Sequence, residues 1–309
     1  MRIVFAGTPE FSAEILKALI EDGHTVAGVV TNPDRPKGRS GKPSPSPVKE
    51  LAEERGIPVL CCEKIRREEA QAWVREKEPE AMIVAAFGQI VPKSLLTFPK
   101  YGCINVHASL LPAFRGAAPV QWAILAGLDT TGVTIMQMSE GLDTGDILSV
   151  RTVPIERSDN TGSLTERLAK EGAGLLLETL PKIEEGSIRP VPQPEESTTP
   201  YAKMITKDMG KIDWTKPARE IENLIRAMNP WPCASAEWNG KSVRILSAEA
   251  LDAAEEGTPG RILTPGRKEL QVVCGTGVLR IRELQLAGKN PVPAAAFRNG
   301  QKAEGTFFS

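Results

Sequence analysis

Residues 2–31 read RIVFAGTPEFSAEILKALIEDGHTVAGVVT, and this stretch decides the fold class. The apolar runs at residues 3–6 and 26–31 predict buried strands, and residues 10–20 between them predict a helix. Strands that alternate with helices in this way form βαβ units and pair into a parallel sheet. The sequence therefore predicts an α/β fold whose N-terminal part contains a Rossmann-like parallel sheet.

The alternation of strands and helices continues along the chain. Further strands are expected at residues 82–86, 103–106 and 132–138. Helices are expected at residues 48–55, 118–126 and 163–183. The first two of these strands are short and apolar, as buried central strands of a parallel sheet are. Ligands bind beyond the carboxyl ends of such strands, so the residues after position 106 are placed at a ligand-binding crevice.

The second part of the chain has a different pattern. Residues 186–200 hold four prolines among Gln, Glu, Ser and Thr, a composition typical of an extended linker. A helix over residues 217–228 and five short alternating runs then predict a small OB-like β-barrel. These runs cover residues 234–238, 241–248, 260–263, 270–274 and 277–286. We expect an α/β domain at 1–188, a linker at 189–206 and a β-barrel domain at 207–309, since typical domains have about 100–200 residues.

The composition is that of a folded globular protein. Hydrophobic residues make up 41% and charged residues 25% of the chain, which argues against a disordered, collagen-like or disulfide-rich protein. No apolar run approaches the roughly 18 residues of a membrane helix, and no signal peptide precedes the first strand, so we expect a cytoplasmic protein. The five cysteines lack Cys-x-x-Cys spacing, so reduced thiols and no metal site are expected.

One basic segment stands out in a chain whose net charge is -1. That net charge predicts no overall attraction to nucleic acid, so any phosphate-binding surface must be local. The positive side chains of residues 34–43 are Arg35, Lys37, Arg39 and Lys42. The prolines and glycines of the segment exclude helix and strand. Because it is longer than the usual connection of about two to six residues, we expect a functional loop; the alternative is a solvated segment without a ligand.

The candidate site lies in residues 105–112, which read NVHASLLP, and in residues 141–146, which read GLDTGD. Asn105 and His107 are two positions apart in a predicted strand, so their side chains share one face. Both donate hydrogen bonds, and donors aimed at a developing oxyanion are often the largest catalytic contribution in acyl transfer. Asp143 would orient His107 or accept protons during the transfer.

Each of these residues also has a purely structural interpretation. Asn105 would cap a loop, His107 would be a satisfied polar residue, and Asp143 would form an Asx-turn. The other of the two histidines, His24, lies in a turn between a predicted helix and strand, so a site that needs an imidazole would use His107. A rigid turn directly after the strand favours the catalytic interpretation, because such a turn presents backbone donors to a ligand.

The first predicted strand is followed by Gly7, Thr8 and Pro9. The N-terminus of a helix attracts anions, but this segment has neither the G-x-G-x-x-G nor the G-x-x-x-x-G-K-[ST] pattern. We therefore predict that Thr8 caps the helix, that Pro9 is its first residue, and that no nucleotide cofactor binds.

Several segments resemble folate-dependent formyltransferases, in particular the methionyl-tRNA formyltransferase family. They are residues 5–11 (FAGTPEF), 105–112, 115–121 (RGAAPVQ) and 141–146, and the resemblance extends through the linker into the C-terminal barrel. The Asn, His and Asp signature is shared with enzymes that formylate glycinamide ribonucleotide or sugar amines, so it indicates the chemistry better than the acceptor. The basic segment and the second domain favour initiator Met-tRNA as the acceptor.

The resemblance implies that 10-formyltetrahydrofolate is the formyl donor and that backbone groups hold most of its pterin. The implied folate-binding residues are Phe87, Gly88, Gln89, Ile90, Ser109, Leu110, Leu111 and Pro112. The α-amino group of methionine attacks the formyl carbon. Asn105 and His107 stabilise the oxyanion, and Asp143 moves protons and holds His107.

The resemblance also implies how tRNA binds, because in this family the basic loop inserts at the acceptor end. The implied contacts are Arg35, Lys37, Arg39 and Lys42, with Lys203, Lys207 and Lys211 extending the path near the domain junction. We expect a monomer, and we expect Trp231 to pack at the barrel entrance, with stacking on RNA as the alternative. Two other functions stay open: formyl transfer to a small amine such as a nucleotide-linked sugar, and RNA binding without catalysis, which an aromatic content of 5% disfavours.

Overall fold

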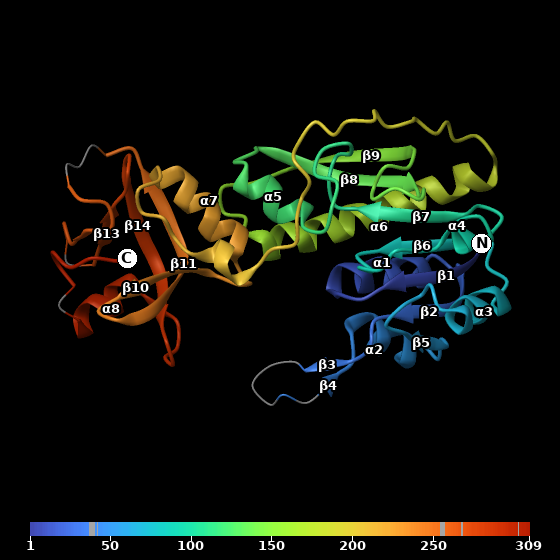
Figure 1. The fold of residues 1–309 in the computed structure, drawn as a ribbon, viewed down its shortest axis with the longest axis horizontal. Helices are drawn as coiled ribbons and strands as arrows, with labels where there is room; N and C mark the ends of the chain where they lie inside the picture. Colours follow the sequence, from blue (N-terminus) through green and yellow to red (C-terminus); the bar gives the residue numbers. More distant parts are fainter. Residues whose placement is uncertain (37–40, 42, 254–256, 267, 302) are drawn as a thin grey trace. The chain divides into compact units, whose positions relative to one another are not determined.

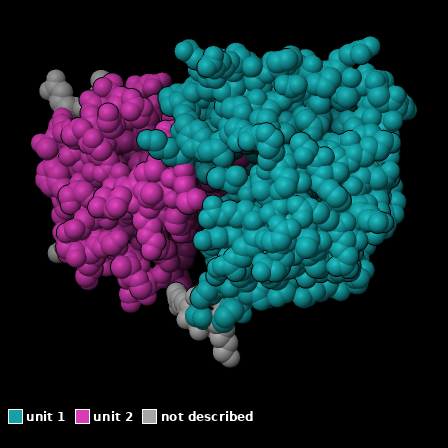
Figure 2. All heavy atoms as spheres, turned by 45° about the vertical axis from the view of Figure 1, so that its right-hand side comes forward, with its two compact units in different colours: residues 1–119, 130–154, 165–203 teal, residues 120–129, 155–164, 204–309 magenta. Residues whose placement is uncertain are grey.

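The computed structural model describes residues 1–36, 41, 43–253, 257–266, 268–301 and 303–309. The chain divides into two compact units (Figure 1, Figure 2). Unit 1 contains Met1–Pro119, Thr130–Pro154 and Thr165–Lys203. Unit 2 contains Val120–Asp129, Ile155–Leu164 and Met204–Ser309. Two short segments that precede residue 165 therefore group with the C-terminal part.

Unit 1 is built on a seven-stranded sheet with the order β5-β2-β1-β6-β7-β8-β9 (Figure 1). Its strands are β1 (Arg2–Gly7), β2 (Thr25–Thr31), β5 (Val59–Cys61), β6 (Ala81–Ala85), β7 (Cys103–His107), β8 (Thr130–Gln137) and β9 (Ile147–Pro154). The strands from β5 to β7 pair in parallel, whereas β8 and β9 each run antiparallel to the strand before them. The predicted sheet is thus confirmed as a mostly parallel one. Because the chain builds outward from β1 on one side and then on the other, the ends of β1 and β6 flank a crevice of the kind that binds ligands.

Helices pack on both faces of this sheet. They are α1 (Glu10–Glu21), α2 (Pro47–Glu54), α3 (Glu68–Glu76), α4 (Lys93–Leu96) and α6 (Thr161–Glu184). On one face, Val4 of β1 packs in a core with Val74 of α3 and Leu95 of α4. On the other face, Gly172 of α6 lies so close to Val106 that an added Cβ would be 2.9 Å from its Cγ1. Side chains alternate along a strand, so β7 turns every second side chain away from α6.

The basic segment forms a short strand at each end, β3 (Arg35–Pro36) and β4 (Pro43–Ser44), and the two pair antiparallel. The prediction that this segment contains no strand is therefore wrong at both ends. An isolated two-residue ladder tolerates proline because no further strand needs the missing N–H. Arg35 is exposed, and Lys37, Arg39 and Lys42 lie outside the described residues.

The start of α1 also differs from the prediction. The helix begins at Glu10, its N-cap is Pro9, and no side chain caps it. The Thr8 hydroxyl instead accepts a hydrogen bond from Nδ2 of Asn32, 2.9 Å away. The predicted Thr8 cap is wrong because this hydroxyl bonds to the residue after β2 rather than to the helix backbone.

Unit 2 combines an antiparallel sheet with the helix α7 (Ala218–Met228). Its other elements are α5 (Pro119–Leu125, from its second residue), a 3-10 helix (Lys207–Gly210), β10 (Ala234–Trp238), β11 (Lys241–Leu251), β12 (Ile262–Leu263), β13 (Leu270–Val273), β14 (Val278–Leu286), β15 (Val292–Pro293) and α8 (Ala294–Gly300). Ile221 and Ile225 of α7 share a core with Val243 and Leu279 of the sheet. The predicted small barrel is confirmed as an antiparallel half-barrel. None of the helices in the described part of the chain is long and apolar enough to cross a membrane.

Trp231 follows α7 and lies between Pro230 and Pro232, each of which is preceded by a cis peptide bond. Its side chain is 54% exposed. The prediction that it packs at the entrance of the barrel is therefore wrong. Proline cannot continue a helix, so α7 ends before this segment and the indole leaves the apolar face of the helix.

Candidate active site

Asn105 and His107 lie on β7, and the alternation of the strand turns both side chains to the face opposite α6. Asn105 is 8% exposed and His107 is 6% exposed. Within the described part of the chain, no hydrogen bond occupies the side-chain amide of Asn105. With no partner among the described residues, this amide is available to a ligand.

The His107 ring is held between a carbonyl and a carboxylate. Its Nε2 atom lies 3.2 Å from the carbonyl oxygen of Phe114. A carbonyl oxygen only accepts, so this contact places a hydrogen on Nε2. Its Nδ1 atom lies 3.9 Å from Oδ1 of Asp143, which is longer than a hydrogen bond. The arrangement fixes the ring and leaves Nδ1 and Oδ1 facing each other.

Asp143 lies in the loop between β8 and β9, with a φ of 54° in the left-handed region. Its Oδ2 atom accepts a hydrogen bond of 2.9 Å from the backbone N–H of Gly116. Gly116 has a φ of 129°, and a Cβ added to it would lie 2.6 Å from the carbonyl oxygen of Ala202. Glycine is therefore required at the position that holds the carboxylate.

The thiol of Cys103, on the same strand as Asn105 and His107, is not a further catalyst. Burial raises the pKa of the Cys103 thiol to about 12, so it is not a nucleophile near neutral pH. Among the residues that the structure describes, no group of three or more His, Cys, Asp or Glu side chains is placed to hold a metal ion. The arrangement thus offers hydrogen-bond donation by Asn105 and proton transfer at His107 and Asp143.

Two amide side chains link the ends of β1, β2 and β6 beside the crevice. Nδ2 of Asn32 donates to Oγ1 of Thr8 at 2.9 Å and to the carbonyl of Phe87 at 2.8 Å. Nε2 of Gln89 donates to Oδ1 of Asn32 at 2.9 Å and to the carbonyl of Cys62 at 2.8 Å. Sequence reasoning missed Asn32, although an amide directly after an apolar strand was a usable signal. Gln89, expected to bind folate, uses its side chain within the protein.

The expected folate-binding residues 87–90 offer mainly backbone groups and one apolar side chain. Phe87 is 2% exposed, whereas Ile90 is 70% exposed. A Cβ added to Gly88 would meet no atom within 4 Å, so the space beside it is open. A flat ligand therefore has room against this backbone, with Ile90 as an apolar contact.

The turn after β7, also expected to bind folate, is held from inside. Oγ of Ser109 donates to the carbonyl of Ala113 at 2.6 Å. Oγ1 of Thr134, on β8, donates to the Ser109 carbonyl and accepts from the N–H of Leu111. The side chains of Ser109 and Leu111 are buried and shape the turn. The partly exposed residues of the turn are Leu110 and Pro112.

The residues expected to contact tRNA belong to both units. Arg35 and Lys203 lie in unit 1, and Lys207 and Lys211 lie in unit 2. All four side chains are exposed. Nζ of Lys211 is 3.1 Å from a carboxylate oxygen of Asp208, an exposed pair that salt weakens. Within each unit these cations are accessible to phosphate groups.

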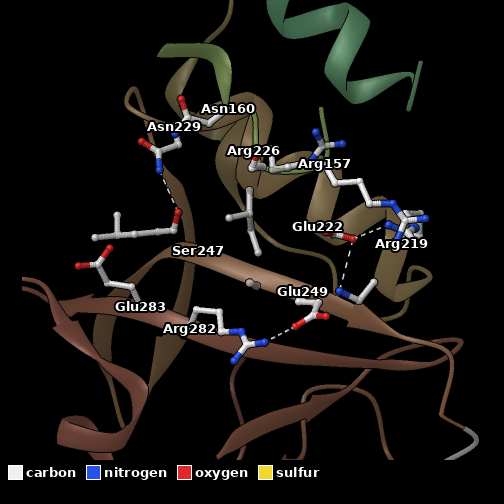
Figure 3. A pocket seen from close by; sticks show the side chains of 15 residues that line it. Arg157, Asn160, Arg219, Glu222, Arg226, Asn229, Ser247, Glu249, Arg282 and Glu283 are labelled. Carbon is white, nitrogen blue, oxygen red and sulfur yellow. Dashed lines mark hydrogen bonds and ion pairs between the residues drawn. The ribbon is translucent and has the colours of Figure 1, made fainter. Parts of the chain in front are cut away.

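Unit 2 also holds a pocket of about 580 Å³ between α7 and β11, which sequence reasoning missed (Figure 3). Its charged lining residues are Arg157, Arg219, Arg226, Arg282, Glu222, Glu249 and Glu283. Nη1 of Arg219 donates to Glu222 at 2.9 Å, and Arg282 donates to Glu249, as the dashed lines in Figure 3 mark. Four positive and three negative side chains nearly cancel, so the pocket lacks the charge of a phosphate-binding groove.

Both parts of the chain match models of known protein families. Residues 1–180 match the formyl transferase family, and residues 204–302 match the C-terminal domain of formyl transferases. The methionyl-tRNA formyltransferase of Agathobacter rectalis is 47% identical over 310 residues, which cover 100% of both chains. That of Citrifermentans bemidjiense is 49% identical over 304 residues, which cover 98% of this chain and 95% of the relative.

Solved structures share the fold at lower identity. HypX from Aquifex aeolicus in complex with tetrahydrofolic acid is 21% identical, with a TM-score of 0.65 over 96% of this chain and 46% of that chain. WlaRD, a sugar 3N-formyl transferase solved with dTDP and 5-N-formyl-THF, is 19% identical, with a TM-score of 0.64 over 94% of this chain and 99% of that chain.

Proposed function

The chain belongs to the methionyl-tRNA formyltransferase family and formylates initiator Met-tRNA, and we propose that 10-formyltetrahydrofolate is its donor and that Asn105, His107 and Asp143 carry out the transfer. The observation that carries the proposal is the nearly buried Asn105 amide, which has no partner among the described residues. It lies on the same strand as an imidazole that is held in place, and a carboxylate that is also held in place lies beside that imidazole. An amide, an imidazole and a carboxylate are the groups that acyl transfer to an amine needs.

The residues around the crevice fit a folate. The backbone at Gly88 is open to a ligand, and the exposed side chain of Ile90 offers an apolar surface to a flat ring. Two proteins of the same fold were solved with tetrahydrofolic acid and with 5-N-formyl-THF. Backbone groups would hold most of the pterin, because the Gln89 side chain is engaged within the protein.

When bound, 10-formyltetrahydrofolate supplies the electrophilic formyl carbon. Attack by the amine moves negative charge onto the formyl oxygen. The side-chain N–H groups of Asn105 would donate to that oxygen, and strand β7 fixes the backbone that carries them. His107 stands two residues further along the same face, with its ring held by the Phe114 carbonyl.

The amine attacks only when it is unprotonated, so the site must also remove protons. Oδ2 of Asp143 is engaged by the Gly116 N–H, which leaves Oδ1 as the oxygen that accepts the proton. The 3.9 Å between Oδ1 and Nδ1 of His107 lets the imidazole share that proton with the carboxylate after a small approach. Asn105 would therefore stabilise the charge, and Asp143 and His107 would pass the proton of the amine to the donor nitrogen. The bond between that nitrogen and the formyl carbon then breaks, and tetrahydrofolate leaves.

The tRNA would be bound by cations from both units, of which the described ones, Arg35, Lys203, Lys207 and Lys211, are exposed. Those in the basic segment are Arg35, Lys37, Arg39 and Lys42, and those further along the chain are Lys203, Lys207 and Lys211. Each contact to a phosphate releases counterions, so binding should weaken steeply with salt. We also propose that the protein acts as a monomer in the cytoplasm, where charged initiator tRNA is made available for translation.

The test is transfer of labelled formyl from 10-formyltetrahydrofolate to initiator Met-tRNA, with free methionine and a nucleotide-linked amino sugar as alternative acceptors. We expect transfer to Met-tRNA alone, and loss of that transfer in His107→Ala. Transfer to the amino sugar with none to Met-tRNA would contradict the proposed acceptor. Transfer to Met-tRNA that survives His107→Ala would contradict the proposed site.

A further inference from the structure

Residues 191–202, expected to be an extended linker, run across the catalytic part of unit 1, and we name them the strap. Val191 forms an isolated antiparallel bridge with Ile147 of β9, and Ala202 forms a parallel bridge with Gly116. The N–H of Ala202 donates to the Arg115 carbonyl at 2.8 Å. The strap thus joins the loop after β7 to the strand that follows the Asp143 loop.

The side chain of Arg115 holds the strap by hydrogen bonds. Its side chain is 7% exposed. The guanidinium donates to Oε1 of Gln193 at 3.1 and 2.9 Å, to the Pro194 carbonyl at 2.7 Å and to the Glu195 carbonyl at 3.0 Å. No carboxylate forms an ion pair with it among the residues the structure describes. A buried cation whose partners are all neutral oxygens of one segment makes that segment an integral part of the site.

Gln193 carries this connection to the catalytic loop. Its Oε1 accepts from Arg115, and its Nε2 donates to the carbonyl of Asp143 at 3.0 Å and to that of Gly145 at 2.7 Å. Every hydrogen-bonding atom of the amide is therefore used. Asp143 needs such support because it is a non-glycine residue in the left-handed region, a conformation that persists only where the surroundings hold it.

We propose that Arg115 and Gln193 are positioning residues for Asp143, an inference that rests on the proposed function of this site. Residues 115 and 116 hold Asp143 at two points. The Gly116 N–H donates to its carboxylate, and Arg115 holds Gln193, which donates to its backbone carbonyl. Together these bonds set Oδ1 at its distance from His107. Loss of the Gln193 bonds should therefore disturb proton transfer without removing any group that touches the substrate.

The chain offers a variant that isolates this effect. Gln193→Glu keeps an oxygen acceptor for Arg115 but has no N–H to donate to the carbonyls of the Asp143 loop. Its matched control is Ser197→Ala, because Oγ of Ser197 donates to the Pro112 carbonyl at 2.6 Å and holds the strap to the turn rather than to the Asp143 loop. Both variants lose strap hydrogen bonds, and only the first loosens Asp143.

The decisive experiment measures hydrogen exchange of residues 141–146 and steady-state transfer to Met-tRNA in the full-length protein. For Gln193→Glu we expect exchange at least about 10-fold faster in this loop, and a kcat about 10- to 100-fold lower with KM within about twofold, because a small misplacement of a catalytic group is enough to slow the reaction. Ser197→Ala should change neither quantity, and both variants should melt within about 2 °C of wild type.

The inference would be overturned if residues 141–146 exchanged hydrogen as slowly in Gln193→Glu as in the wild type. It would also be overturned if Ser197→Ala lowered kcat as much as Gln193→Glu does. The exchange measurement needs no acceptor, so it decides the role of the strap even if Met-tRNA is not formylated. Failure of the wild type to formylate Met-tRNA would count against the proposed function alone.

Discussion

The site of unit 1 and the pocket of unit 2 differ in how their polar groups are used. The pocket is lined by four arginines and three glutamates, and two of its arginines donate to two of its glutamates. The unit 1 site has one amide, one imidazole and one carboxylate, and the amide of Asn105 has no partner among the described residues. This difference indicates that catalysis depends on a few hydrogen-bonding groups that are held in place and still able to bond to a substrate, and not on the number of charged side chains.

Among the variants that test this difference, Asp143→Asn is expected to lower the rate of formyl transfer the most. The asparagine still offers an oxygen to the Gly116 N–H, so the loop should keep its place, but it cannot take a proton from the amine. We expect the rate of formyl transfer to fall about 10²- to 10⁴-fold, the range of general acid–base catalysis, with an unchanged melting temperature. A rate near that of wild type would show that Asp143 is not the proton acceptor.

The next effect concerns the backbone that holds Asp143. Gly116→Ala would place a Cβ 2.6 Å from the Ala202 carbonyl, so the Gly116 N–H must move away from the carboxylate. We expect transfer to fall about 100-fold. Gly186→Ala is the control: its φ of 68° is also left-handed, but a Cβ there meets no atom. It should lower the free energy of unfolding by about 1–2 kcal/mol and leave transfer unchanged. Equal effects of the two variants on transfer would exclude a specific role for Gly116.

A smaller effect, on the pH dependence of stability, is expected from His24 and distinguishes it from His107. Burial, and then the N-terminal ammonium, lower the pKa of His24 below its usual value of 6.5. The unfolded chain therefore binds the proton more readily, and stability is lost as pH falls below about 6.5. His24→Gln should flatten the pH dependence of the urea midpoint between pH 7.5 and 5.5 and leave transfer unchanged. If His24→Gln abolished transfer, the assignment of the catalytic imidazole to His107 would be in doubt.

The smallest effect is expected from the pocket of unit 2. Arg282→Ala with Glu249→Ala removes both members of an exposed ion pair. Arg280, which also lies 3.5 Å from Glu249, keeps Glu269 at 3.9 Å as a partner. Exposed pairs contribute about 0–1 kcal/mol, so we expect melting within a few degrees of wild type and kcat within about twofold. A loss of kcat as large as that of Asp143→Asn would break the contrast between the two regions.

Much of the fold follows from apolar patterning. The predicted strand at residues 103–106 is β7, and the predicted run 234–238 coincides with β10. The elements that were missed include β5, β9, α3 and α8. β5 has three residues and no fully buried side chain, and β9 is an outer strand whose residues are half-buried or exposed except for one, so neither shows a continuous apolar run. α3 is short and rich in charged and polar residues.

The candidate site was predictable only in part. Asn105 and His107 could be predicted to share a site because residues two positions apart on a strand have side chains on the same face. Asp143 could be named as a candidate because it lies in a loop bounded by glycines. The groups that hold them could not be found, since the Phe114 carbonyl and the Gly116 N–H are backbone atoms that every residue carries. Gln193 lies 50 positions from Asp143 and in a segment whose composition indicated only a linker.

The most direct test of the account is the single-turnover rate of formyl transfer to Met-tRNA by Asn105→Ala at saturating donor. We expect a rate about 10²- to 10³-fold below wild type, the loss expected when one oxyanion donor is removed, with donor affinity and melting temperature unchanged. A rate within about threefold of wild type would contradict the claim that the Asn105 amide on β7 stabilises the developing charge.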